Sequence, residues 1–125
     1  MANPNIVNVT TLTGNTTYLT PGNTTANTLL SNAASSGLVF KINQIVCANV
    51  NGSSAVNATV AINSLAAGAG TNFPIISTIS VPASASVIAV DKTTAVYLME
   101  NQSIVVTSGT SSGITYTISY ESIAS

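Results

Sequence analysis

Five side chains in this 125-residue chain carry a formal charge, and they are the first candidates for chemistry. Two carboxylates held close together can act as general acid and general base, so Asp91 and Glu100 are the pair to consider. Each stands in a polar stretch between apolar segments, and a solvated turn residue is the simpler interpretation of both. Glu121 ends the outward side of the last predicted strand, where it fits a rim charge or a partner for a lysine of another subunit. The two lysines are Lys41 and Lys92.

The chain has no histidine that could serve as the general base for nucleophilic catalysis. Serine and threonine are abundant, but no histidine is present to take a proton from a hydroxyl. Cys47 also lacks a histidine partner, and its place inside an apolar strand predicts a small core residue that forms no intrachain disulfide. Zinc would need His and Cys ligands, and calcium a loop of spaced Asp and Asn residues. Gly68-Ala69-Gly70 lacks the lysine of a phosphate loop and predicts a flexible turn. We therefore expect no enzyme, no catalytic residues, no metal site and no cofactor.

The composition also narrows the class of partner. Charged residues make up 4% of the chain, against roughly 25% in an ordinary soluble domain, and the net charge is −1. Because such a chain cannot neutralise phosphates, we expect no nucleic-acid partner. Its apolar runs are far shorter than the roughly 20 residues that span a membrane, which predicts no membrane partner. Residues 1–5 show no part of a signal peptide, which predicts cytoplasmic synthesis. Low net charge favours self-association.

The elements that must position these groups are predicted to be strands. Residues 114–121 alternate strictly, with Ile114, Tyr116, Ile118 and Tyr120 on one face, as in a half-buried strand. Residues 55–62 alternate in the same way, with Ile62 among the inward residues. In residues 38–50 the alternation places Phe40, Ile42 and Val46 on one side, and Val39, Ile45 and Cys47 on the other.

Turn chemistry connects the predicted strands. Asn51-Gly52 is a strong hairpin signal, so we expect residues 38–50 and 55–62 to form an antiparallel hairpin. Further strands are predicted at residues 74–81, 87–90, 95–99 and 103–107. Short strands at this spacing predict an all-β fold, an antiparallel β-sandwich that is jelly-roll-like.

The first 36 residues differ from the rest in their richness in Thr and Asn. They hold two weak strand patterns, at residues 5–12 and 15–20, and residues 29–36 offer at most one short helical turn. We expect a single domain over residues 1–125, in which residues 1–36 form an N-terminal arm that packs against a neighbour and residues 37–125 form the sandwich core.

From about Ala33 the chain resembles a family of small virion proteins of tailed bacteriophages, notably myoviruses of marine cyanobacteria. The resemblance covers roughly the last 90 residues and consists of core strands and turns, with no catalytic motif. It implies a β-sandwich on the exterior of the particle. Relatives are usually more acidic where this chain has residues 100–103. The stretches that carry the resemblance are residues 33–43, 48–52, 76–82, 90–92, 97–103 and 118–123.

These observations lead us to expect a non-enzymatic virion structural protein, made in the host cytoplasm. The favoured role is a capsid decoration (cement) protein that binds the major capsid protein, or other virion proteins, as a homo-oligomer, with a trimer favoured by analogy. One alternative is a tail, neck or fibre component whose tyrosines stack on host glycans. Another is a pilin-like or surface-layer subunit that donates a strand from residues 1–36. The tyrosines are Tyr18, Tyr97, Tyr116 and Tyr120.

Overall fold

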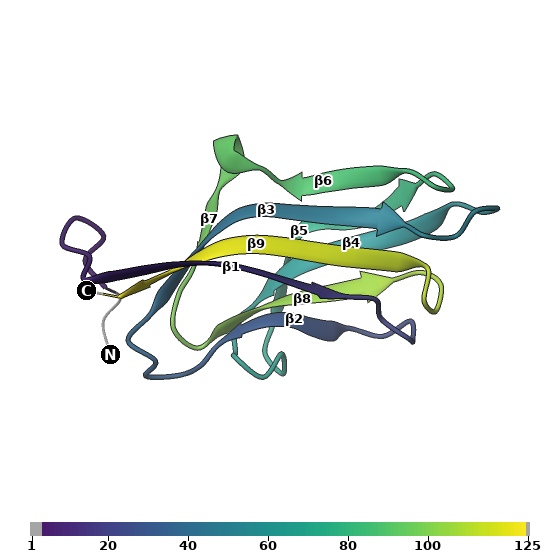
Figure 1. Cartoon of the computed structure of the whole chain (residues 1–125). Coiled ribbons are helices and arrows are strands. Elements are labelled where there is room, and N and C mark those ends of the chain that lie inside the picture. The colour runs from purple at the N-terminus through teal and green to yellow at the C-terminus, as the bar shows by residue number, and fades with distance from the viewer. Residues whose placement is uncertain (1–3, 125) are drawn as a thin grey trace.

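A computed structural model describes residues 4–124 as two antiparallel sheets packed face to face, which confirms the all-β sandwich (Figure 1). The first sheet has the order β1-β9-β3-β6, and the short β7 also pairs with β3. The second sheet has the order β2-β8-β4-β5. The first sheet comprises β1 (Thr11–Leu19), β3 (Val39–Asn49), β6 (Ser86–Val90), β7 (Val96–Leu98) and β9 (Ile114–Ala124). The second comprises β2 (Asn27–Asn32), β4 (Val56–Asn63), β5 (Asn72–Val81) and β8 (Gln102–Ser108).

The connections make this sandwich a jelly roll. The chain passes from one sheet to the other between β1 and β2, β2 and β3, β3 and β4, and β5 and β6, and again on either side of β8. The last strand, β9, therefore lies between β1 and β3, and β8 lies between β2 and β4. This interleaving of early and late strands is the double Greek key of jelly rolls. It holds the first and last thirds of the chain together.

Aliphatic side chains fill most of the space between the sheets, together with Phe40, Cys47 and Tyr116. Ile114, Tyr116 and Ile118 of β9 are fully buried, as their alternation predicts. On β3 the alternation switches sides at Asn43, because the pairing with β9 shifts between Ile42 and Gln44. This bulge lets Phe40 and Ile42, and then Ile45 and Cys47, all face the core, and it puts Val46 outside, contrary to the simple period-2 prediction.

On β4 the predicted alternation holds: Val56, Ala58 and Val60 are buried in the core and Ile62 packs against it, and the strand pairs with β8 in one unbroken register. Ala61 is buried as well, on the other face of the strand. Ala61 lies beside Val105 of β8, outside the central core cluster. Residues 64–71 fold over this outer surface: the carbonyl oxygens of Leu65 and Ala66 accept hydrogen bonds from the hydroxyls of Ser103 and Ser31.

The predicted hairpin of residues 38–50 and 55–62 is wrong. Strands form on both sides of the turn, but β3 lies in the first sheet and β4 in the second. An Asn-Gly hairpin turn needs positive φ at its central residues, and neither Asn51 nor Gly52 has one. The Asn51 side chain instead accepts hydrogen bonds from the backbone nitrogens of Ser53 and Ser54, which fixes a corner between the sheets.

Residues 11–32 form neither the N-terminal arm nor the helical turn predicted within the first 36 residues. β1 pairs with β9 and β2 pairs with β8, so residues 11–32 are built into the sandwich itself. Residues 27–32 are extended, with Leu29, Leu30 and Asn32 buried. The prediction was wrong because the strand partners of these residues come from the far end of the chain, which a local pattern cannot show.

Candidate functional site

Four of the five charged residues come from the outer side of the first sheet and the turn at its edge. Lys41 of β3 and Glu121 of β9 are register partners, and their neighbours Ile42 and Tyr120 pack toward the core. Glu121 does not end its strand, as expected from sequence; its carboxylate accepts a hydrogen bond of 2.8 Å from the side chain of Asn43, the residue of the bulge.

Asp91 and Lys92 lie where the edge strand is interrupted. They begin η1 (Lys92–Thr94), the short 3-10 turn between β6 and β7. The Asp91 carboxylate caps this turn by accepting from the backbone nitrogen of Thr93 at 2.9 Å, and hydrogen bonds from the hydroxyl and backbone of Thr93 lower its pKa. Together with Asn43, Gln44 and Ser119 they line an open depression of about 380 Å³.

Glu100 does not share the depression with Asp91: Asp91 precedes η1, whereas Glu100 lies beyond β7, in the turn that joins β7 to β8. The Glu100 Oε1 is shielded from solvent without a hydrogen-bond partner among the described residues. A pair of carboxylates suited to acid–base catalysis is therefore not formed by Asp91 and Glu100.

Cys47 and Tyr116 are core residues. Burial raises the pKa of the Cys47 thiol from 9.0 to about 12, which keeps it protonated and unreactive at neutral pH. The Tyr116 hydroxyl donates to the carbonyl oxygen of Thr107 at 2.6 Å, and burial raises its pKa as well. Tyr116 is thus excluded from any surface role.

The other tyrosines do not form one stacking surface. Tyr120 is half-buried against Phe40, with ring centroids 5.0 Å apart. Tyr18 is 74% exposed on β1 and Tyr97 is 43% exposed on β7. These two strands lie at opposite edges of the first sheet, so the two exposed rings are separated by β9 and β3.

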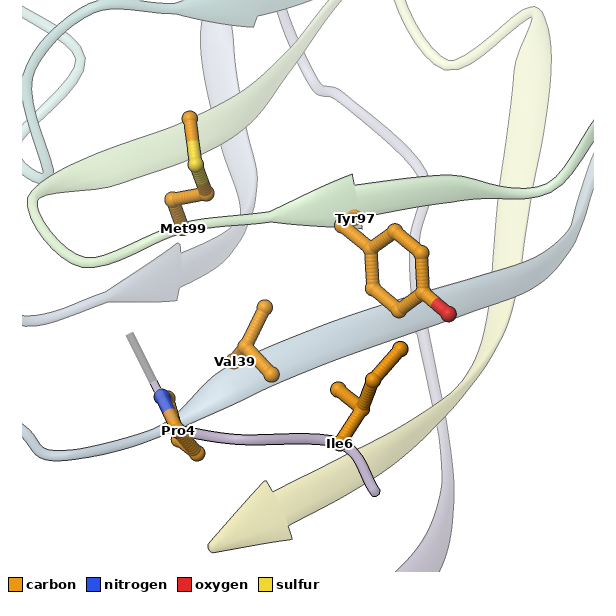
Figure 2. A pocket seen from close by; sticks show the side chains of 5 residues that line it. All are labelled: Pro4, Ile6, Val39, Tyr97 and Met99. Carbon is orange, nitrogen blue, oxygen red and sulfur yellow. The ribbon is translucent and has the colours of Figure 1, made fainter. Parts of the chain in front are cut away.

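An apolar depression at the Tyr97 edge is the surface best suited to binding. It has a volume of about 270 Å³ and is lined by Pro4, Ile6, Val39, Tyr97 and Met99. Figure 2 shows the N-terminal segment with Pro4 and Ile6 lying over Val39 of β3, where Ile6 and Tyr97 approach each other. Val39 is buried beneath them, whereas Ile6, Tyr97 and Met99 are each more than two-fifths exposed.

Sequence reasoning missed this depression. The sequence predicts only a sugar-stacking role for Tyr97, and the apolar pair Ile6-Val7 in a polar segment is the one local signal for a contact there. The depression forms because residue 10 is anchored to the end of β9: the Thr10 nitrogen donates to the carbonyl oxygen of Ala124 at 2.9 Å. With Thr10 held there, the segment that precedes it lies back across β3 (Figure 2).

The described residues, 4–124, contain no group of three or more His, Cys, Asp and Glu side chains that would bind a metal ion. In the same part of the chain, no helix has the length and apolar character needed to cross a membrane. Exposed neutral contacts, rather than charged groups, are what this surface offers. Comparison with protein-family profiles and with curated protein sequences finds no match to the chain.

Proposed function

We propose that this chain is a non-enzymatic structural protein of a tailed-bacteriophage particle, a decoration protein on the outside of the capsid. The observation that carries the proposal is the open apolar depression around Tyr97 on a jelly roll that has very few charged residues. Jelly rolls recur in viral shell proteins. That analogy, together with the resemblance of residues 33–123 to small virion proteins, is the reason for proposing a tailed-bacteriophage particle.

Attachment to the major capsid protein would depend on shape and neutral contacts. Ile6, Tyr97 and Met99 present apolar surface beside Val39, and burying such surface stabilises a complex without ion pairs. Each bound copy would stabilise the shell by mass action, because it binds the assembled state. Screening by salt weakens ion pairs and leaves apolar contacts intact, so attachment should survive about 1 M NaCl.

Electron microscopy of purified particles tests the proposal. An antibody against this chain, carrying gold, should label the head shell at many symmetry-related positions. Labelling at the neck, tail or fibres would reject the decoration role while keeping a virion role. Absence of the chain from particles that package DNA would reject both.

A host-glycan-binding tail or fibre component is the second candidate, favoured by the exposure of Tyr97 and Tyr18. An aromatic face of this kind can stack on a sugar ring, but here each ring stands alone at its own sheet edge. A glycan array probed with the purified chain separates the candidates. Binding that is lost on Tyr97→Ala, with labelling at the tail, would favour this role. Strand donation from the N-terminal segment is disfavoured, because β1 and β2 are already paired within the chain.

A further inference from the structure

The four sheet edges of the sandwich differ in how well they are protected. Natural edge strands are usually blunted by bulges, prolines or charges, since an unprotected edge pairs with other chains. β5 carries Pro74, two register shifts and a positive φ at Thr78. The edge formed by β6 and β7 is interrupted by η1 and by a shift opposite Ile45. β2 is shifted between Thr28 and Leu30.

β1 has none of these devices. Its nine residues pair with β9 in one unbroken register, from Thr11 opposite Ala124 to Leu19 opposite Tyr116. It contains no proline and no charged residue. No residue of the strand, Gly14 included, has a positive φ. One side of this strand pairs with β9, and its other side is the end of the sheet. β1 is therefore a regular, neutral and unprotected edge strand.

The side chains of β1 divide between two faces. Leu19 packs against the core, so the odd-numbered residues point toward the inner face of the sheet. The even-numbered residues point outward, and the hydroxyls of Thr16 and Ser119 meet there at 3.2 Å. Two large apolar side chains stand on this outward face without cover: Leu12 is 57% exposed and Tyr18 is 74% exposed.

Leu12 and Tyr18 are placed symmetrically on the strand, three residues to either side of Asn15. We infer that β1 pairs antiparallel with β1 of a second copy of this chain, about a two-fold axis at Asn15. In this register Leu12 of each copy lies opposite Tyr18 of the second copy, so one axis produces two aromatic–aliphatic cross-strand pairs. Thr13 lies opposite Thr17, and Gly14 opposite Thr16.

A second copy fits this edge better than an unrelated strand for two reasons. The equal spacing of Leu12 and Tyr18 from the centre is the self-complementarity that a two-fold contact requires. The absence of charge from β1 means that the strand meets its own copy without the like-charge contacts that destabilise opposed strands. The contact joins two first sheets into one continuous sheet, and it yields a dimer of the free chain in place of the trimer expected by analogy. It does not depend on attachment to a capsid.

Disulfide trapping of the full chain tests the register. Asn15→Cys should give a covalent dimer on mild oxidation, because the two thiols lie opposite each other on the axis. Thr11→Cys is the matched control on the same strand face: in the proposed register its two thiols are about 27 Å apart, eight residues along a strand, and should not link. Cys47 is fully buried, so the unmodified chain gives the background. Equal linking at both positions, or none at Asn15, would overturn the inference.

Sedimentation equilibrium tests the edge independently. The unmodified chain should be a dimer, and Thr16→Lys should weaken it by at least tenfold, because the two lysines would sit as diagonal neighbours about 7–8 Å apart. Ser77→Lys places the same charge on the exposed, bulged edge of β5 and should leave the dimer intact. Circular dichroism confirms that both variants are folded. A monomer at every concentration, or an oligomer that Thr16→Lys does not weaken, would contradict the proposal.

Discussion

Asn49, the last residue of β3, donates a hydrogen bond of 2.9 Å from its side-chain amide to the carbonyl oxygen of Val81, the last residue of β5. The two strands belong to different sheets, so this buried bond ties the sandwich together at one end. The same amide donates to the carbonyl oxygen of Ser54 at 3.0 Å, and the Asn49 Oδ1 accepts from the Asn51 nitrogen at 2.8 Å. One side chain thereby fixes the corner between β3 and β4.

Asn49→Leu should lower the free energy of unfolding by about 2–4 kcal/mol, because it leaves the buried carbonyl oxygen of Val81 without a donor and removes the hydrogen bond to Ser54. Urea denaturation measures the change. Asn57→Leu is the matched control, because Asn57 is exposed on β4, and it should change stability by less than about 0.5 kcal/mol. A cost for Asn49→Leu no larger than that of the control would show that the amide does not lock the corner.

Gly68→Ala should destabilise the fold by about 1–3 kcal/mol. Gly68 has a φ of +76°, where an L side chain is strained, and an added Cβ would lie 2.8 Å from the Thr28 hydroxyl oxygen. The thermal unfolding midpoint should fall accordingly. Gly22→Ala, at a position with nothing within 4 Å of an added Cβ, serves as control and should leave the midpoint unchanged or slightly raised. A mobile turn would instead tolerate both changes equally.

The contrast between β9 and β1 shows how much of the fold is predictable from the sequence. The strict alternation of residues 114–121 identifies a half-buried strand, and the structure buries Ile114, Tyr116 and Ile118 as predicted. Residues 11–19 carry no comparable period, because at the sheet edge their side chains are mostly exposed on both faces. Their strand conformation comes from pairing with β9, about a hundred residues away.

The buried asparagines are a second feature of the fold that could not be predicted from the sequence. Asn32, Asn49 and Asn63 are each the last residue of a strand, and each donates to two backbone carbonyl oxygens. In a chain so rich in asparagine, nothing local separates these three from exposed ones such as Asn57. The apolar depression was missed for a related reason: it exists only because residues 4–9 return across Val39.

Tyr97→Ser combined with Met99→Ser should reduce attachment to the capsid at least tenfold, because it removes the exposed apolar surface of the depression. Co-sedimentation with capsid shells that lack the chain measures the change, and the loss should be the same at 0.1 M and 1 M NaCl. Ile88→Ser is the control: Ile88 is 55% exposed on β6, outside the depression. Attachment that survives the double variant, or that is released by salt alone, would contradict the proposed mode of binding.

The fold should lose stability in alkali through two buried groups. Burial raises the pKa of the Cys47 thiol from 9.0 to about 12 and also raises the pKa of the Tyr116 hydroxyl. Between the unfolded and folded pKa values the unfolded chain has released a proton that the folded chain retains. Unfolding is therefore favoured as pH rises from about 9 toward 12 for Cys47, and from about 10 upward for Tyr116. Within its own window each group contributes a slope of about 1.4 kcal/mol per pH unit. Below pH 9 neither group contributes a pH dependence.

Urea denaturation across pH 8 to 11.5 measures this slope. Cys47→Ala should lower the free energy of unfolding at pH 8 through the lost packing. It should also make the decline above pH 9 shallower, by the slope that one titrating group contributes. Tyr116→Phe keeps the ring in place and removes the second titrating group, so the two substitutions together should flatten most of the decline. The Cys47 thiol should also react with a thiol reagent at the rate of unfolding and no faster. A decline that is equally steep in the double variant would place its origin in other groups.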